Sequence, residues 1–192
     1  MKKYTLIALM TVSSWSILSS CGENNNNPEK KSDDSVENAK DLNKDNKAMA
    51  EDDSKFAVTA ANGGMLEVTL GGLAVQKSSN PRVKAYGSML VTDHTKANNE
   101  LKALALNKNI ALPAALGEEE QHHVNDLSKK AGKDFDKAYM SMMVDDHKKD
   151  ISEFEKASDK ASDVDLKTFA SQTLPTLRMH LDSAKAIHDA IK

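Results

Sequence analysis

The feature that most constrains this chain is an internal repeat. Residues 84–100 read KAYGSMLVTDHTKANNE and residues 137–153 read KAYMSMMVDDHKKDISE, with ten identities in seventeen positions. Average residue usage would give about one identity by chance. Because such self-similarity reflects a repeated structural unit, we expect both segments to form the same element and to place Asp-His alike.

Both copies have the apolar periodicity of a helix, and no strand-like alternation persists after residue 54. The predicted fold class is therefore all-α. Helix breaks are expected at Asn80-Pro81, at Leu112–Gly117, at Gly132 and at a capping box over residues 162–165. These breaks predict helices over 54–78, 81–108, 118–130 and 133–160, and a last helix from the capping box to the C-terminus.

Four of these helices are long, at about 40 Å each, and must bury their apolar faces against one another. We therefore predict a four-helix bundle with a short extra helix, residues 118–130, between the second and third long helices. The link between those two helices could cross the length of the bundle or fold back, and the sequence leaves both open.

One ionisable residue in each long helix is expected to face the core near mid-helix: Glu67, His94, His147 and His180. Together they would form one polar layer, which must be satisfied by mutual hydrogen bonds, water or metal. One interpretation is a site for a single divalent ion, such as Zn, Fe or Mn. The alternative is a hydrogen-bonded network that sets helix register.

The aspartates that precede two of these histidines, Asp93 and Asp146, point about 100° away from them. They are expected to pair with Lys96 and Lys149 one turn on. The alternative is that they orient metal-binding histidines through hydrogen bonds.

Other candidate sites carry less weight. His122 and His123 lie at the start of the short helix, where solvated side chains are the simpler interpretation, and His188 is expected to be exposed. Met143 lies one turn before His147, and a thioether with an imidazole would suit copper(I), although methionine is more often core filler. Haem between two inward histidines is a further alternative, without a Cys-x-x-Cys-His motif.

The N-terminal residues are predicted to be a processing and anchoring region. Residues 1–20 have the basic start and apolar core of a signal peptide, and LSSC resembles a lipobox that would be lipidated at Cys21. Residues 21–53 are polar, with five lysines against ten acidic residues, which predicts a disordered acidic tether. Residues 54–192 have balanced charge, which argues against a nucleic-acid partner.

Several strings resemble a family of uncharacterised bacterial proteins, predicted to be outer-membrane or secreted, with a ferritin-like domain of unknown function. The matching motifs are the two M-x-V-x-D-H segments and the segment L-P-T-L-x-x-H, and the resemblance covers nearly all of 55–191. It implies a ferritin-like bundle in the cell envelope, with no activity assigned. Di-iron bundles carry Glu-x-x-His on core helices, and the core helices here lack that motif.

The sequence thus leads to two hypotheses of function. The first is a lipid-anchored envelope protein whose helical bundle binds one divalent ion. The outer membrane is preferred because Gly22, and not Asp, follows Cys21. The second is a non-catalytic structural or interaction module of the envelope. Neither hypothesis decides whether the protein is an enzyme.

Overall fold

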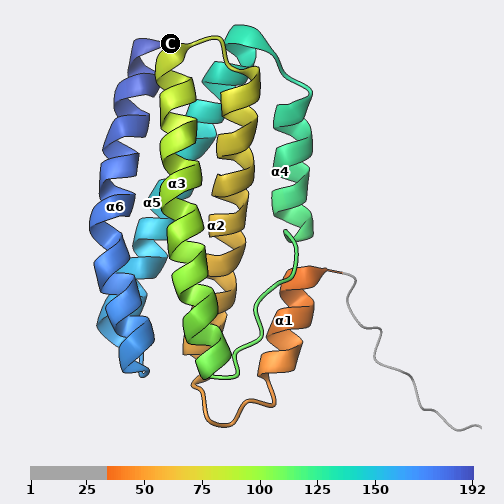
Figure 1. Cartoon of the computed structure of the whole chain (residues 1–192), viewed down its shortest axis with the longest axis vertical. Coiled ribbons are helices and arrows are strands. Elements are labelled where there is room, and N and C mark those ends of the chain that lie inside the picture. Colours follow the sequence, from red (N-terminus) through yellow and green to blue (C-terminus); the bar gives the residue numbers. More distant parts are fainter. Residues whose placement is uncertain (1–33) are drawn as a thin grey trace, which may run out of the picture. The chain divides into compact units, whose positions relative to one another are not determined.

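The computed structural model describes residues 34–192, all of whose regular structure is helical (Figure 1). Six helices follow in order: α1 (Ser35–Asn43), α2 (Glu51–Lys77), α3 (Pro81–Asn107), α4 (Glu118–Ser128), α5 (Gly132–Lys160) and α6 (Val164–Ala190). The all-α prediction is confirmed, and the five predicted helices begin and end within a few residues of α2 to α6. Within residues 34–192 no helix is long and apolar enough to cross a membrane.

The long helices form a bundle of two pairs. α2 packs mainly along α3, and α5 mainly along α6, while narrower contacts of α2 with α5 and of α3 with α6 join the pairs (Figure 1). Where α2 and α3 meet, a Cβ atom on Gly71 would lie 2.7 Å from the Gly87 carbonyl oxygen, and one on Gly87 equally close to the Gly71 carbonyl. Only glycine permits this backbone approach.

The link between α3 and α5 crosses from one end of the bundle to the other. At one end, Lys108 after α3 pairs with Asp163 before α6 at 2.7 Å. At the other end, Lys77 of α2 donates to the carbonyl oxygen of Lys130, just before α5, at 3.2 Å. Residues 108–131, which include α4, therefore span the bundle beside α2 (Figure 1). This arrangement makes α3 and α5 run in the same direction.

The sequence predicts a disordered tether over residues 21–53. The structure describes residues 34–53 of this segment, and there the prediction is wrong, because α1 is a packed helix. Asp34 caps α1 by accepting hydrogen bonds from the Val36 and Glu37 amides. Ala39 is buried, and α1 packs on α2. Composition was misleading here because α1 is held by polar side chains as well as by apolar burial. The predicted signal peptide and Cys21 lie outside the described residues.

Polar residues of α1 and its flanks hold the irregular segment 108–117 in place. Asn43 donates to the Ala111 carbonyl at 2.9 Å and accepts from the Ala111 amide at 2.7 Å. Ser35 accepts from the amides of Ala114 and Ala115, and Asp34 accepts from the Glu118 amide. These bonds satisfy backbone groups that have no helical partner, so α1 fixes the path of the crossover.

Replacing Asn43 with alanine is expected to lower the free energy of unfolding by about 2 kcal/mol. The side chain is buried, and its removal leaves two backbone groups of Ala111 without partners, each costing about 1–3 kcal/mol if water cannot reach it. Urea unfolding of the wild type, Asn43→Ala and the exposed control Asn99→Ala measures this. Equal midpoints for wild type and Asn43→Ala would contradict a structural role for α1.

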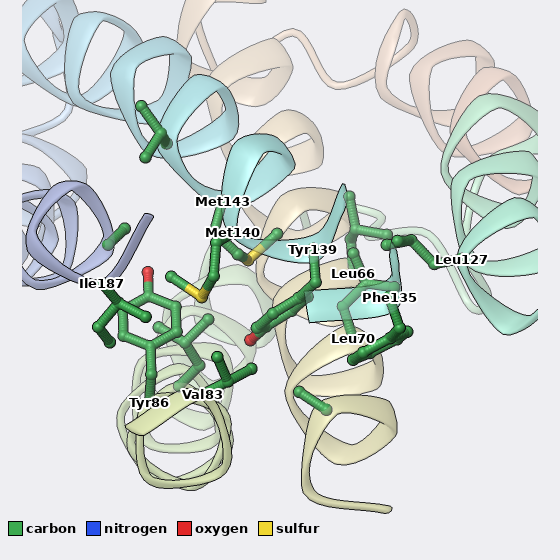
Figure 2. Close-up of a cluster of buried hydrophobic side chains, with 14 residues drawn as sticks. Leu66, Leu70, Val83, Tyr86, Leu127, Phe135, Tyr139, Met140, Met143 and Ile187 are labelled. Atoms are coloured by element: carbon green, nitrogen blue, oxygen red, sulfur yellow. The ribbon is translucent and has the colours of Figure 1, made fainter. Parts of the chain in front are cut away.

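The apolar core is divided into two clusters, one toward each end of the bundle. The first includes Leu70, Leu90, Met143 and Ile187, and the second includes Phe56, Leu101 and Phe169. Figure 2 shows the first cluster, which Tyr86 joins from α3 and Tyr139 from α5. In the sequences of α3, α5 and α6, each core histidine falls between residues of the two clusters, so a polar layer separates them.

Candidate metal centre

Each of the four long helices contributes one side chain to this layer: Glu67 from α2, His94 from α3, His147 from α5 and His180 from α6. All four are buried, with exposed fractions of 6% for His94 and at most 1% for the others. The ring centroids of the three histidines are 5.2 to 5.8 Å apart. The helical period thus places all four residues together in the core, as the sequence predicted.

Each imidazole is held through one ring nitrogen by a group that accepts a hydrogen bond. His94 Nδ1 lies 2.7 Å from Glu67 Oε2, and His147 Nδ1 lies 2.9 Å from the Met143 carbonyl oxygen. His180 Nε2 lies 2.9 Å from Asp93 Oδ2, which is a partner on another helix. A carbonyl oxygen or an ionised carboxylate accepts only, so the nitrogen that faces it carries the proton in a neutral ring. For His94 this tautomer therefore requires that Glu67 is ionised.

The opposite nitrogen of each neutral ring then carries a lone pair. These nitrogens are Nε2 of His94, Nε2 of His147 and Nδ1 of His180, and all three are buried without a hydrogen bond. One ring nitrogen of each histidine lies within 4.8 Å of one ring nitrogen of each of the other two. Ligating histidines in metalloproteins have this arrangement, with one nitrogen on the metal and the other hydrogen-bonded to a carboxylate or carbonyl.

Burial keeps these imidazoles neutral, which is the form that binds metal. Loss of solvent lowers the pKa of His94 to about 4. Burial, together with the neighbouring His94 and His180, lowers the pKa of His147 to about 3. Burial also lowers the pKa of His180, although Asp93 opposes this shift. No proton therefore competes for the three nitrogens at neutral pH.

Unsatisfied polar atoms are concentrated around this layer. Among residues 34–192, eight buried side-chain nitrogen or oxygen atoms make no hydrogen bond. Seven of them belong to the four layer residues, to Asp146 and to the two tyrosines Tyr86 and Tyr139. The Tyr86 ring centroid lies 6.4 Å from that of His147 and 6.2 Å from that of Tyr139. Orphaned buried groups are rare in proteins and call for a water or an ion.

Glu67 stands between the histidines and a group of acidic side chains. Its Oε2 atom contacts His94, and its Oε1 atom lies 3.2 Å from His147 Nε2 in a geometry that makes no hydrogen bond. One of its oxygens also groups with carboxylate oxygens of Asp146 and Asp150. Burial, and secondarily Asp146, raise the pKa of Glu67 well above its usual value, so a nearby cation would favour its ionised form.

The other sequence candidates lie apart from the layer. On α4, His122 is exposed and pairs with Asp126, while His123 is partly exposed and lies 3.9 Å from Glu119. His188 lies 3.6 Å from Asp189 near the C-terminal end of α6. Met143 offers its carbonyl oxygen to His147, while its side chain is buried in the first apolar cluster. The structure therefore gives no support to a thioether ligand beside His147.

The sequence reasoning missed Asp150 and the hydroxyl groups of Tyr86 and Tyr139. Asp150 lies one turn after Asp146, so helical spacing could have placed both on one face. The repeat gives no signal for Asp150, because the corresponding residue of the first copy is Ala97. Both tyrosines occupy the same position of the repeat, where their rings fit the apolar periodicity and the sequence does not show that their hydroxyl groups are buried.

Because His147 is buried in its neutral form, it makes the free energy of unfolding of the metal-free protein depend on pH. Its folded pKa of about 3 lies below the ordinary histidine pKa of 6.5, which applies to the unfolded chain, so the unfolded chain binds more protons between these values. Stability from this residue is present above pH 6.5 and is lost as the pH falls. Relative to His147→Gln, the wild type should lose up to about 1.4 kcal/mol per pH unit in this window.

Urea unfolding in chelator at pH 7, 6, 5 and 4 measures this difference, with the exposed His122→Gln as control. This control reports the effect of the same substitution outside the polar layer. A constant difference between the wild type and His147→Gln would show that His147 titrates alike in the folded and unfolded chains.

A family model described as "Domain of unknown function (DUF4142)" matches residues 38–187. No curated protein matches the chain. Among solved structures, a DUF305 fragment from Deinococcus radiodurans is similar, with a TM-score of 0.66 at 11% identity. The similarity covers 74% of this chain and 98% of that fragment, and at this identity it speaks to the fold alone.

Proposed function

The chain belongs to the DUF4142 family, whose description assigns no activity. From the site itself we propose that the bundle binds one divalent metal ion in its core. The ring nitrogens of His94, His147 and His180 would be the ligands, and Glu67 would complete or border the site. Three histidines with a further open position suit Zn, and also Fe or Mn when a carboxylate joins.

One observation carries this proposal. Three buried imidazoles converge, each with one nitrogen held by an acceptor and the other without a partner. A hydrogen-bonded network that only fixes helix register would have to satisfy its own members. Here one ring nitrogen of each histidine is buried without a hydrogen bond, so the network hypothesis explains less of the geometry.

The bundle would be a ferritin-like four-helix bundle with a changed metal site. Its support is the single long crossover between α3 and α5, which is one of the connections used by ferritin-like folds. In place of paired Glu-x-x-His motifs, the core offers three histidines on three helices. The protein would hold its ion for storage, delivery or use in the cell envelope.

Lipidation at Cys21 would anchor the bundle to a membrane, the outer membrane by preference. Its support is the sequence LSSC after a basic and apolar start, and Gly22 after the cysteine. Cell fractionation with radiolabelled palmitate tests this. The wild type should be labelled and sediment with outer membranes, and Cys21→Ser should be unlabelled. Label retained by Cys21→Ser would exclude this anchor.

Titration with Co²⁺ tests the metal site directly, because its visible absorption reports the number and kind of ligands. The wild type should saturate at one equivalent and show the absorption of a four- or five-coordinate nitrogen site. His147→Gln should give the weak spectrum of hydrated Co²⁺, and the exposed control His122→Gln should match the wild type. A hydrated spectrum for the wild type would refute the proposed site.

A further inference from the structure

Three carboxylates gather beside the histidines, on the side of the bundle that faces α4. Asp146 and Asp150 come from consecutive turns of α5, and Glu67 comes from α2. One oxygen of each lies within 4.8 Å of those of the other two. The three histidines form a second group, in which one ring nitrogen of each lies within 4.8 Å of the others.

Two oxygens of this group are buried and lack partners. Glu67 is 1% exposed, and its Oε1 atom accepts no hydrogen bond; the same holds for the buried Oδ2 atom of Asp146. Burial and mutual repulsion raise the pKa of Asp150 well above its usual value, while Lys149 opposes the shift. Carboxylates this close in a low-dielectric site repel one another unless a proton or a cation lies between them.

From this geometry we infer that Glu67, Asp146 and Asp150 form a second cation site, which takes a hard divalent ion such as Mn²⁺. Carboxylate oxygens are the donors that Mn²⁺, Mg²⁺ and Ca²⁺ prefer, whereas imidazoles suit Zn²⁺. Glu67 lies at the boundary of the two sites, since it contacts His94 and His147 as well as the aspartates. The inference rests on the proposed function in one respect: the ion at the histidine site is taken to be the neighbour of this second ion.

An acidic surface hollow lies beside Lys149, the residue that precedes Asp150 in α5. It has a volume of about 550 Å³ and lies between α1, α2, α4 and α5, with Glu118, Glu119 and Glu120 in its lining. Glu120 and His123 of α4 are close enough to Asp146 to interact with it electrostatically. A lining with more acidic than basic side chains raises the local concentration of cations at this surface.

Mn²⁺ binding tests the second site in full-length protein whose histidine site has first been filled with one equivalent of Zn²⁺. Electron paramagnetic resonance counts free Mn²⁺, and mass spectrometry counts bound Zn²⁺ in the same samples. The variant is Asp146→Asn/Asp150→Asn, and the control is Asp145→Asn/Asp159→Asn, which removes the same charge from exposed positions of α5. We expect one Mn²⁺ in the wild type and control, and at least tenfold weaker binding in the variant.

A second measurement needs no variant. With Cu²⁺ in place of Zn²⁺ at the histidines, a Mn²⁺ ion that shares Glu67 should couple magnetically to it and lose its ordinary spectrum. Absent Mn²⁺ binding, equal binding in the variant, or an uncoupled Mn²⁺ spectrum beside bound Cu²⁺ would each overturn the second site. The Zn²⁺ count separates the two claims: bound Zn²⁺ without Mn²⁺ refutes only the carboxylate site, and Mn²⁺ held by the aspartates without bound Zn²⁺ refutes only the histidine site.

Discussion

Saturating Zn²⁺ is expected to raise the unfolding temperature of the wild type by about 5–10 °C and to leave His94→Leu/His147→Leu unchanged. An ion that binds only the folded state stabilises it by about 2.7 kcal/mol at one hundred times its dissociation constant. For a domain of this size, each kcal/mol shifts the midpoint by roughly 2–4 °C. The unfolded chain cannot bring the three histidines together, since they come from three helices.

Thermal melts with Zn²⁺ and with chelator measure this effect. His122→Leu/His123→Leu is the matched control, because it makes the same substitutions at exposed positions of α4. If the polar layer is only a hydrogen-bonded network, neither Zn²⁺ nor chelator will move any midpoint. In that case the core double variant could even be more stable, as apolar residues often replace buried polar groups without loss.

Replacing Asp93 with alanine is expected to weaken metal binding by about 10- to 100-fold without abolishing it. Its carboxylate holds His180 Nε2 at 2.9 Å and so presents Nδ1 to the layer. Loss of such an orienting partner typically weakens metal affinity to this extent. Asp93→Asn keeps an oxygen acceptor and should fall between alanine and wild type.

Competition with a chromophoric chelator gives the affinities. The control Asp182→Ala removes an equal charge from an exposed position two residues from His180. Wild-type affinity in Asp93→Ala would mean that His180 needs no orientation from Asp93, or that it is not a ligand. The unfolding midpoint of metal-free Asp93→Ala should fall, because the buried His180 Nε2 loses its hydrogen-bond acceptor.

The direction of the core side chains could be read from the sequence because it depends on helical periodicity alone. His94, His147 and His180 fall in apolar stripes, and each lies between apolar residues on either side along its helix. Residues near the middle of their helices fall in one layer whichever way the helices run. The polar layer could therefore be predicted although the direction of α5 could not.

Contacts between different helices could not be predicted in the same way. The pairing of Asp93 with His180 depends on how α3 and α6 are rotated against each other. The crossover of residues 108–131 depends on which bundle end receives α5, and both choices are compatible with the same helix pattern. Composition likewise failed for α1, whose Asn43 bonds with Ala111 join residues far apart in the sequence.

The metal content of the protein as purified tests the central claim most directly. The full chain is purified without a polyhistidine tag or chelator and is assayed by mass spectrometry beside His94→Leu/His147→Leu and His122→Leu/His123→Leu. We predict that the wild type and the exposed control retain one metal at the histidines, and that the core variant loses it. A wild type without metal, which also takes up no Zn, Fe, Mn or Cu when these are added, would contradict a metal centre in this bundle.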